Sequence, residues 1–334
     1  MPIILILTHS EDDTASMVIG HLRKMDVGHK RFNTDQFQKT VGLSVHLDSR
    51  GALQGCYHFP EGDIDFREIG VVWNRRVKEP VSQEIYDDPE VHDWALQETK
   101  YALYNSFTLI NAPIVNPFEN NERIKFNKLV QMKRASEMGF EVPKTCLTNR
   151  PETALDFCTV NGQDKLVILK KIRKGLVTLR DGRRLLLHTS IVPREKINSA
   201  SMQCAKVAPL LLQNHIEKKY DVRSIVVGDE VFSFAIHSQE TEWGKTDFRT
   251  AAALGEKLRH EAIDLGAEVN NALVVYTKSF GLAFSAIDMI VTKDDRIVFL
   301  EDNPNGQWGW LEETTGVSIS MAFARYLAKR TKTW

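Results

Sequence analysis

The segment from residue 285 to residue 307, SAIDMIVTKDDRIVFLEDNPNGQ, limits what this chain can fold into more than any other stretch. Two runs rich in Ile, Val, Phe and Leu flank the turn sequence KDD, which predicts a β-hairpin. Because side chains alternate along a strand, Glu301 and Asn303 are expected to share a face of the second strand. The same alternation places Ile297 and Phe299 on that face.

Asp288, on the first strand of this hairpin, joins Glu301 and Asn303 if the strand register brings it opposite them. Three oxygen ligands of this kind suit Mg²⁺, which keeps waters and substrate phosphates as its other ligands. The pattern therefore predicts a nucleotide-metal site at the end of the hairpin. An alternative stays open on these residues alone, in which the two acids are solvated strand-end charges and Asn303-Pro304 is a turn signal.

Length and composition describe a globular chain of more than one domain. Its 334 residues are too many for one ordinary core and suggest two or three domains. Lysine and arginine number 43 against 44 acids, so we expect no global attraction to nucleic acid or to a membrane. Cys56, Cys146, Cys158 and Cys204 lack C-x-x-C spacing and are expected to be buried free thiols. The opening MPIILILTHSEDD fits neither a signal peptide nor a spanning helix, which favours a cytoplasmic location.

Residues 1–115 are predicted to form a Rossmann-like N-terminal domain. Residues 3–7 indicate a buried strand and residues 14–25 a helix, but no G-x-G-x-x-G follows, which disfavours a dinucleotide site. KRFNTDQF and VVWNRR are typical of later strands with polar ends. An aromatic stripe at helical spacing over residues 91–109 predicts a helix that serves the core or a dimer interface. The Pro- and Asn-rich PIVNPFENNE, residues 113–122, marks the domain boundary.

Residues 116–207 are predicted to form a central domain. One helix is expected over residues 123–139, and Lys128 lies in it. The apolar run LVIL predicts a strand that leads into Lys170 and Lys171, only one of which can face a bound nucleotide. The basic, glycine-containing segment that follows is either a hairpin that closes over triphosphate or a solvated loop.

Residues 208–334 are predicted to form the third domain. The strand APLLLQNHI ends in polar groups, and SIVVGDEVFSFAI predicts a hairpin that turns at Gly228-Asp229. The hairpin with the acids and a helix over residues 318–329 complete this part.

Together these motifs resemble an ATP-grasp ligase, most closely the graspetide synthetases that build ω-ester or ω-amide crosslinks in microviridin-type ribosomal peptides. A more distant likeness is to the ribosomal-protein glutamate ligases of the same superfamily. The motifs that carry the resemblance are FNTDQF, VWNRR, Lys128 in its helix, VILKK, QNHIEKKYDVRSIVVGDEVF, TDFR, AIDMI and FLEDNP. The resemblance implies an α/β (α+β) ATP-grasp fold with a Rossmann-like N-terminal domain, a central domain and a C-terminal ATP-grasp domain.

The resemblance also implies a nucleotide site. Lys128 and Lys170 would contact the phosphates of ATP, with the neighbouring lysine as the alternative to Lys170. Gln213, Asn214 and Ile216 would form the hinge where main-chain groups bind the adenine edge. Asn214 stands where many members of the family have glutamate, which leaves the side-chain part of adenine recognition open.

Further residues take roles by the same resemblance. Asp221 would contact the ribose, and Arg223, on the same strand face, would reach the transferred phosphate or acyl phosphate. Arg249 would stabilise the acyl phosphate. Asp247 would orient the Arg249 side chain or form a purely structural pair with Arg249. The metal ligands would be Asp288, Glu301 and Asn303, holding two Mg²⁺ ions.

The implied reaction joins side chains within one peptide. A carboxylate of a ribosomal precursor peptide attacks the γ-phosphate of ATP, and a nucleophile then displaces phosphate from the acyl phosphate. The sequence leaves open whether an ester or an amide forms. It also leaves open a ligase that adds amino acids to a small molecule or a protein, and a non-catalytic, nucleotide-dependent peptide-binding protein.

The partner is expected to be held at a second place. Graspetide synthetases as a family hold a leader segment, and Glu240, Glu242 and Trp243 are predicted to provide part of that contact here. Acids beside an aromatic ring suit an amphipathic leader helix. The alternative is an ordinary polar loop. A homodimer is expected.

Overall fold

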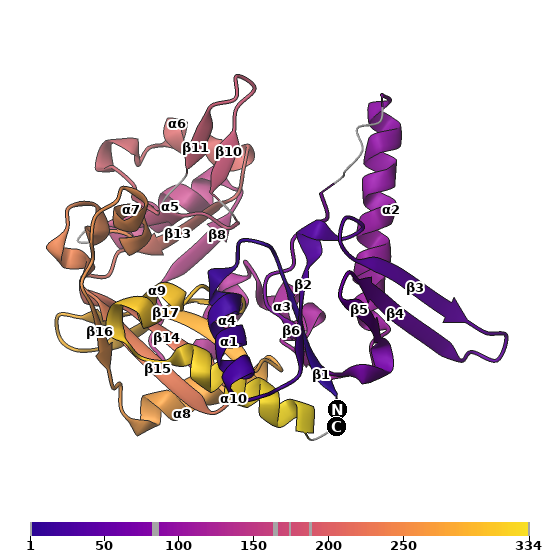
Figure 1. Cartoon of the computed structure of the whole chain (residues 1–334). Coiled ribbons are helices and arrows are strands. Elements are labelled where there is room, and N and C mark those ends of the chain that lie inside the picture. The colour runs from indigo at the N-terminus through magenta and orange to yellow at the C-terminus, as the bar shows by residue number, and fades with distance from the viewer. Residues whose placement is uncertain (1, 82–86, 163–165, 174, 187–188, 333–334) are drawn as a thin grey trace.

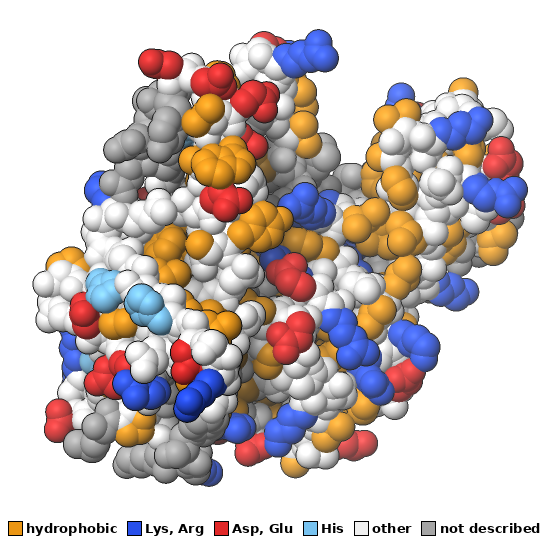
Figure 2. All heavy atoms as spheres, turned by 90° about the vertical axis from the view of Figure 1, so that its right-hand side faces the viewer, with side chains coloured by type: hydrophobic (Ala, Val, Ile, Leu, Met, Phe, Trp, Pro, Cys, Tyr) orange, Lys and Arg blue, Asp and Glu red, His pale blue; other side chains and the backbone are white. Residues whose placement is uncertain are grey.

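The computed structural model describes residues 2–81, 87–162, 166–173, 175–186 and 189–332. Within these residues, the three larger sheets follow one another along the chain, with strand orders β2-β1-β6-β7, β12-β9-β13-β8 and β16-β15-β14-β17-β18. Figure 1 shows the N-terminal part beside the C-terminal sheet, with the central part above that sheet. On the face that Figure 2 shows, acidic and basic side chains are interspersed, in keeping with a net charge of -1.

The N-terminal sheet is parallel throughout. Its strands are β1 (Ile3–Thr8), β2 (His29–Asn33), β6 (Ile69–Asn74) and β7 (Ile114–Val115). The runs IILILT and IGVVWN are almost wholly buried, as expected for parallel strands that are covered on both faces. Helix α1 (Asp13–Lys24) makes the connection from β1 to β2. The carboxyl ends of the strands therefore meet at one edge, where ligands bind in open α/β sheets.

A small antiparallel sheet extends from the N-terminal domain, with strand order β3-β4-β5. Its strands are β3 (Gly42–Leu47), β4 (Leu53–Phe59) and β5 (Gly62–Asp65). Tyr57 and Phe59 point into the domain core from one face of β4, so the other face is left to polar side chains.

Helix α2 (Pro89–Thr108) is the long helix that the aromatic stripe predicts. It buries Leu103 and Phe107 in the core of the N-terminal domain. Trp94 and Tyr101 are 64% and 60% exposed. The stripe is therefore split between the core and the surface.

The central domain is an antiparallel sheet covered by a helix. Its strands are β8 (Thr145–Thr148), β9 (Val167–Lys170), β12 (Ser190–Ile191) and β13 (Leu210–Asn214), and α5 (Pro151–Gly162) packs on it. Strand β13 pairs with β8 and β9, so it belongs to the central sheet and not to the third domain, where the sequence predicts it. The basic segment after β9 forms the two-stranded ribbon β10 (Leu176–Thr178) and β11 (Arg184–Leu186), and α6 (Ser199–Met202) follows. The expected hairpin is present, except that residue 174 lies outside the described residues.

The C-terminal sheet is the largest and carries the predicted acids. Its strands are β14 (Lys218–Val227), β15 (Glu230–Ile236), β16 (His260–Ile263), β17 (Phe284–Thr292) and β18 (Ile297–Asn303). Its helices are α7 (Phe248–Ala253), α8 (Ala267–Ser279), α9 (Gly309–Thr315) and α10 (Ile319–Lys332). Both predicted hairpins are confirmed, and Gly228 turns the first of them at a φ of 63°.

One hydrophobic core joins the N-terminal domain to the C-terminal sheet. Ile6 and Trp73 from the parallel sheet, Ile225 from β14 and Phe323 from α10 belong to the same buried cluster. The rings of Trp73 and Phe323 lie 4.6 Å apart between centroids. The edge of the parallel sheet is therefore held in a fixed position against the strands that carry the acids.

The single helix expected around Lys128 is in fact two. Helix α3 (Phe118–Ile124) ends before Phe126, which has a φ of 62°, and α4 (Lys128–Glu137) begins after it. The Asn127 side chain accepts a hydrogen bond from a backbone N–H of the first turn of α4. Lys128 thus lies at the first position of a helix, where a cap fixes its backbone.

Two smaller expectations are corrected. The strand predicted from KRFNTDQF ends at Asn33, because a short 3-10 helix, Thr34–Gln36, follows. The four cysteines are free thiols, but only Cys158 is buried and Cys204 is exposed.

Within the described residues, no helix is long and apolar enough to cross a membrane.

Candidate active site

A pocket opens between the central sheet and the C-terminal sheet. Strands β9, β13, β14, β17 and β18 and the segment before α7 all contribute to its lining. It gathers most of the predicted site residues: Lys170, Gln213, Asn214, Ile216, Asp221, Asp247, Arg249, Asp288 and Glu301. Residues between positions 143 and 301, from both the central and the C-terminal sheet, thus meet at one place.

The two acids of the C-terminal hairpin lie side by side. Asp288 of β17 is the direct partner of Glu301 of β18, as the sequence predicts. Partners across antiparallel strands present their side chains on the same face. Asn303 pairs with Ala286, two residues before Asp288, and therefore lies on this face as well.

A β-bulge at Leu300 corrects the alternation predicted for β18. The partner of Asp288 is Glu301, but the partner of the next residue of β17 is Phe299, so Leu300 is unpaired. The bulge puts Phe299 and Ile297 on the face opposite Glu301, in the core beneath α8. The prediction that these apolar side chains share the face of the acids is wrong.

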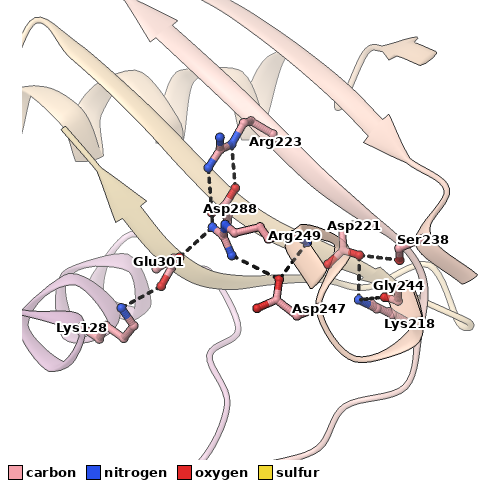
Figure 3. A network of polar contacts seen from close by, with 10 residues as sticks. All are labelled: Lys128, Lys218, Asp221, Arg223, Ser238, Gly244, Asp247, Arg249, Asp288 and Glu301. Atoms are coloured by element: carbon pink, nitrogen blue, oxygen red, sulfur yellow. Dashed lines mark hydrogen bonds and ion pairs between the residues drawn. The ribbon is translucent and has the colours of Figure 1, made fainter. Parts of the chain in front are cut away.

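One arginine bridges the two carboxylates. Arg249 Nη2 lies 2.8 Å from Glu301 Oε1 and is also bonded to Asp288 Oδ2 (Figure 3). Burial would lower the pKa of Arg249, but both carboxylates raise it. A single positive group therefore already occupies the space between two negative ones.

A second arginine clamps Asp288 from the neighbouring strand. Arg223 Nε donates to Asp288 Oδ1 at 2.8 Å, and Arg223 Nη2 donates to Oδ2 at 3.0 Å. Parallel donation of this kind fixes both the position and the plane of the carboxylate. Arg223 Nη1 also donates to the backbone oxygen of Gln307 at 3.0 Å, so the loop after β18 is tied to the site.

Lys128 reaches the same cluster from the start of α4. Its Nζ lies 2.8 Å from Glu301 Oε2. Burial alone would raise the pKa of Glu301, but Arg249, Lys128 and Lys170 hold it well below its usual value. Glu301 is therefore ionised, and three cationic side chains share its charge.

The strand end of β9 delivers Lys170 and not Lys171 to the pocket. Lys170 lines the pocket, whereas Lys171 is absent from its lining. Burial lowers the pKa of Lys170, and the nearby Glu301 opposes that shift. The position of Lys170 agrees with the predicted strand face.

Asp247 is the N-cap of α7. Its Oδ1 accepts a hydrogen bond from the backbone N–H of Arg249 at 3.1 Å and lies 3.6 Å from Arg249 Nη1. The same carboxylate thus caps the helix and sets the direction of the arginine. An orienting residue needs this geometry, and the role of Asp247 stays a prediction.

Asp221 lies deeper in the pocket wall and is already bonded. Lys218 Nζ lies 2.6 Å from Asp221 Oδ2, and Ser238 Oγ donates to the same oxygen at 2.5 Å. Burial raises the pKa of Asp221, although Lys218 opposes it. Asp221 and Arg223 share a strand face, as predicted.

The expected hinge residues line the pocket at the end of β13. Gln213 is fully buried, and its amide nitrogen donates to Thr145 Oγ1 at 2.8 Å. The backbone N–H of Asn214 donates to the Lys144 carbonyl at 3.1 Å. Gln213 is thus held by the central sheet, and Ile216 lies two residues beyond Asn214 at the pocket edge.

Asn303 is set apart from the two acids. It is exposed and outside the pocket lining, and its Oδ1 accepts from the backbone N–H of Asn305 at 3.1 Å. Between it and Glu301, the side chain of Asp302 points to the opposite face and is buried. Burial raises the pKa of Asp302 to about 8, and Ser285 Oγ donates to it at 3.0 Å.

The predicted leader-binding residues lie on the segment that leads into the pocket. Trp243 is 57% exposed. Glu240 is paired with Arg259 at 2.7 Å, and Glu242 lies 3.9 Å from Lys245. Lys245 and Asp247 line the pocket, so the C-terminal end of this segment lies beside Arg249.

Sequence reasoning missed a link between the N-terminal domain and the site. Arg75 is buried and lies 3.3 Å from Asp12 through its Nε. Its other nitrogens donate to the Gly306 carbonyl at 3.1 Å and to Gln307 Oε1 at 2.8 Å. The only available signal was the polar end of VVWNRR, which marks a strand end but not its partner.

The donor set between the two hairpin acids fits a divalent cation. Asp288 and Glu301 offer two carboxylates on one face, and a cationic nitrogen already contacts both. Carboxylate oxygens are the ligands that Mg²⁺ prefers. The pocket therefore combines a carboxylate pair that could hold a cation with lysine and arginine side chains, as an enzyme that handles phosphate groups requires.

The fold and this pocket define an ATP-grasp ligase, and sequence comparison agrees. Residues 3–122 match the MvdD pre-ATP grasp domain, and residues 125–327 match the RimK-like ATP-grasp domain. The chain belongs to the RimK-like ATP-grasp family. No curated protein matches it in a sequence search.

Solved structures extend this result over the whole chain. One similar structure is a RiPP-associated ATP-grasp ligase from Chryseobacterium gregarium in complex with ADP and a leader and core peptide. It is 28% identical to this chain, the alignment covers 99% of this chain and 97% of the other, and the TM-score is 0.89. The macrocyclase MdnC of Microcystis aeruginosa, bound with the precursor peptide MdnA, is 25% identical over 98% and 99% of the two chains, with a TM-score of 0.84. The macrocyclase MdnB of the same organism is 25% identical, over 98% and 99%, with a TM-score of 0.76.

These comparisons confirm two expectations from the sequence. The fold is the mixed α/β ATP-grasp fold, and the chain is an enzyme of the ATP-grasp ligase class. The structural relatives are ATP-grasp ligases and macrocyclases that act in the chemistry of ribosomal peptides, as the motifs indicate.

Proposed function

We propose that this enzyme activates Asp or Glu side chains of a ribosomal precursor peptide as acyl phosphates and closes intramolecular crosslinks. Ser or Thr hydroxyls would give ω-esters, and Lys amines would give ω-amides. The observation that carries the proposal is the convergence of Arg249 and Lys128 on the paired acids Asp288 and Glu301 in the pocket. The relatives bound with ADP and with precursor peptides support it.

ATP would lie along the pocket from the hinge to the paired acids. Lys170 and Lys128 would contact its phosphates, and main-chain groups near Ile216 would bind the adenine edge. Both hydrogen bonds to Asp221 end at Oδ2, and we assign Oδ1 to the ribose hydroxyls. This arrangement uses the partly buried Lys170 as a fixed positive charge beside the phosphates.

Asp288, Glu301 and Asn303 would hold two Mg²⁺ ions. When bound, the ions neutralise the charge that develops on the phosphates. Arg249 bridges the two carboxylates in this structure, so it must leave that position for a cation to bind there. Its guanidinium would then turn toward the transferred phosphoryl group, while Asp247 keeps its backbone in place.

The reaction has two steps. ADP is the leaving group of the first step, and phosphate is the leaving group of the second. A carboxylate oxygen of the peptide attacks the γ-phosphorus of ATP, and the bond to ADP breaks. A hydroxyl or amine then attacks the acyl carbon and loses its proton, and phosphate leaves. Arg249 would stabilise the acyl phosphate, and Arg223, which Asp288 fixes in two places, would contact the transferred phosphate.

The peptide would be held at a second place beside the pocket. We assign part of the leader contact to Glu240, Glu242 and Trp243, because their segment continues into the pocket lining. A tethered peptide presents its reacting side chains at a high effective concentration. The exposed aromatic side chains of α2, Trp94 and Tyr101, support a homodimer through that helix.

The RimK-like domain match favours a second candidate. In it, the same acyl phosphate is captured by the amine of a free amino acid, which adds that residue to a protein or a small molecule. The two candidates differ in the change of mass. A crosslink removes one water from the peptide, whereas an addition increases its mass.

ADP release tests the proposal. The purified enzyme is supplied with ATP, Mg²⁺ and the precursor encoded beside its gene, and ADP is measured with and without the peptide. We expect release that depends on the intact core. A matched precursor whose core acids are replaced by Asn and Gln should give only the background rate. Release that requires a free amino acid and no precursor would support the second candidate. No release with any peptide would indicate a non-catalytic binding protein.

A further inference from the structure

The outer face of the β3-β4-β5 sheet brings together a thiol, an imidazole and a carboxylate. Cys56 and His58 are two residues apart on β4, and Asp63 of β5 is the direct partner of His58, so the three side chains share a face. His58 Nδ1 lies 2.9 Å from Asp63 Oδ1 and 4.0 Å from Cys56 Sγ. The three donor atoms all lie within 4.8 Å of one another.

We propose that these three residues hold one divalent transition metal of the zinc class. Sulfur and nitrogen ligands select such ions over Mg²⁺ and Ca²⁺. Zinc binds sulfur, nitrogen and oxygen at about 2.0 to 2.3 Å in a tetrahedron, which sets the ligand atoms roughly 3.3 to 3.6 Å apart. The distances of 2.9 Å and 4.0 Å from His58 Nδ1 to the other two ligand atoms lie on either side of that spacing. Small side-chain rotations would therefore bring the three atoms to the spacing that a metal ion requires.

A partner on the third strand supports a built site and not a chance cluster. Ser44 of β3 is paired with Cys56, and its Oγ lies 2.9 Å from His58 Nε2. When Nδ1 binds a metal, Nε2 carries the ring proton and donates it to this hydroxyl. A fixed partner on the second ring nitrogen is the usual companion of a metal-binding histidine.

The ligand charges would balance the charge of a divalent ion, and one coordination position would remain for water. Binding breaks the S–H bond of Cys56, forms the bond from Sγ to the metal and releases the proton to water. The thiolate and Asp63 then balance a divalent ion. Asp65, the partner of Cys56, is paired with Arg67 at 2.6 Å, so a water takes the fourth position.

The proposed site is separate from the ATP pocket. Figure 1 shows the β3-β4-β5 sheet on the far side of the N-terminal domain from β17. A metal there would brace the β4-β5 hairpin and would take no part in phosphoryl transfer. Its test therefore needs a spectroscopic readout and not enzyme activity.

Cobalt binding provides that readout. The reduced, chelator-treated full chain is titrated with Co²⁺, and thiolate-to-cobalt absorption in the near ultraviolet is followed. We expect the thiolate absorption to correspond to one bound Co²⁺ per chain, and Zn²⁺ to remove it. Cys56→Ser should abolish the absorption, while Cys204→Ser, which removes an exposed thiol elsewhere, should keep it. Glu301→Gln should also keep it, which separates this site from the cation site of the pocket.

Two further measurements distinguish a built site from a single reactive thiol. Ser44→Ala should weaken cobalt binding by about 10- to 100-fold, as for loss of a partner to a metal-bound histidine. One proton should be released per metal by the wild type and none by Cys56→Ser. Wild-type protein without thiolate absorption at excess Co²⁺, or absorption that survives Cys56→Ser, would overturn the proposal. Equal affinity of wild type, Ser44→Ala and His58→Gln would do the same.

Discussion

Gln131 of α4 exchanges two hydrogen bonds with the backbone of Asp302 in β18. Its Nε2 donates to the Asp302 carbonyl at 2.8 Å, and its Oε1 accepts from the Asp302 N–H at 3.0 Å. Gln131 lies one helical turn after Lys128, and Asp302 directly follows Glu301. The pair therefore fixes the start of α4 against the strand end and holds the Lys128–Glu301 contact in place.

Gln131→Ala should loosen this alignment. It leaves two buried backbone groups without partners, so we expect the free energy of unfolding to fall by about 2 to 4 kcal/mol. The affinity for ATP should fall as well, because Lys128 loses its fixed position. Lys133→Ala, on the exposed side of the same helix, is the matched control. Denaturant unfolding and calorimetric titration of an ATP analogue measure the two effects. If Gln131→Ala keeps both the wild-type free energy of unfolding and the wild-type affinity, Gln131 does not hold Lys128 in place.

Lys170→Ala should weaken binding of a non-hydrolysable ATP analogue far more than Lys171→Ala. Only Lys170 lines the pocket, so its loss removes a charged contact to phosphate. Loss of one such contact corresponds to about a 10- to 100-fold change in affinity. Isothermal titration of both variants gives the ratio. A larger loss for Lys171→Ala would mean that the face of β9 is assigned wrongly.

Asp302→Asn tests the buried acid behind the site by its pH dependence. The pKa of Asp302 is raised to about 8 by burial, so the folded state holds a proton that the unfolded state releases above its ordinary pKa. Its contribution to stability is therefore present at low pH and is lost as pH rises from about 4 to about 8, by up to roughly 1.4 kcal/mol per pH unit.

The amide cannot ionise, so Asp302→Asn should escape this loss. We expect the variant to gain stability relative to wild type between pH 5 and pH 8, as measured by denaturant unfolding. Ser285 Oγ can still donate to the side-chain oxygen of the amide. A difference between variant and wild type that stays constant across this pH range would show that Asp302 is ionised throughout.

Reversing charge on the segment before α7 should weaken leader binding. Glu240→Lys combined with Glu242→Lys is expected to lower the affinity for a labelled leader peptide by about 10-fold or more, and to leave the affinity for ATP unchanged. Fluorescence anisotropy measures the first and calorimetry the second. Arg259→Gln is the control, because it breaks the Glu240–Arg259 pair without reversing the charge at Glu240. Equal leader affinity in all variants would place the leader elsewhere.

Local patterns predict most of this fold because they depend on near neighbours. Apolar runs and turn sequences locate the hairpins, and the pairing of Asp288 with Glu301 is as expected. Alternation fails at Leu300, because a bulge depends on the partner strand and leaves no mark on hydrophobic pattern. The break before Lys128 is missed for a similar reason, since Phe126 carries no signal for a positive φ.

Long-range polar contacts are the part of the site that sequence could not provide. The resemblance points to Arg249 and Asp288, but not to the bridge that Arg249 makes between two acids. Arg75 and Gln307 are more than two hundred positions apart and meet only because a shared core fixes the two domains. Asn303 keeps its predicted face, and its role as a metal ligand stays a prediction.

Intact-mass measurement of the precursor tests the central claim most directly. The precursor is co-expressed with the wild-type enzyme or with Glu301→Gln, which keeps the shape of the side chain but removes the charge that Arg249 and Lys128 contact. The account predicts the loss of one water for each crosslink with the wild type, and an unmodified mass with the variant. A precursor of unchanged or increased mass with the wild type, or water loss that persists in Glu301→Gln, would contradict it.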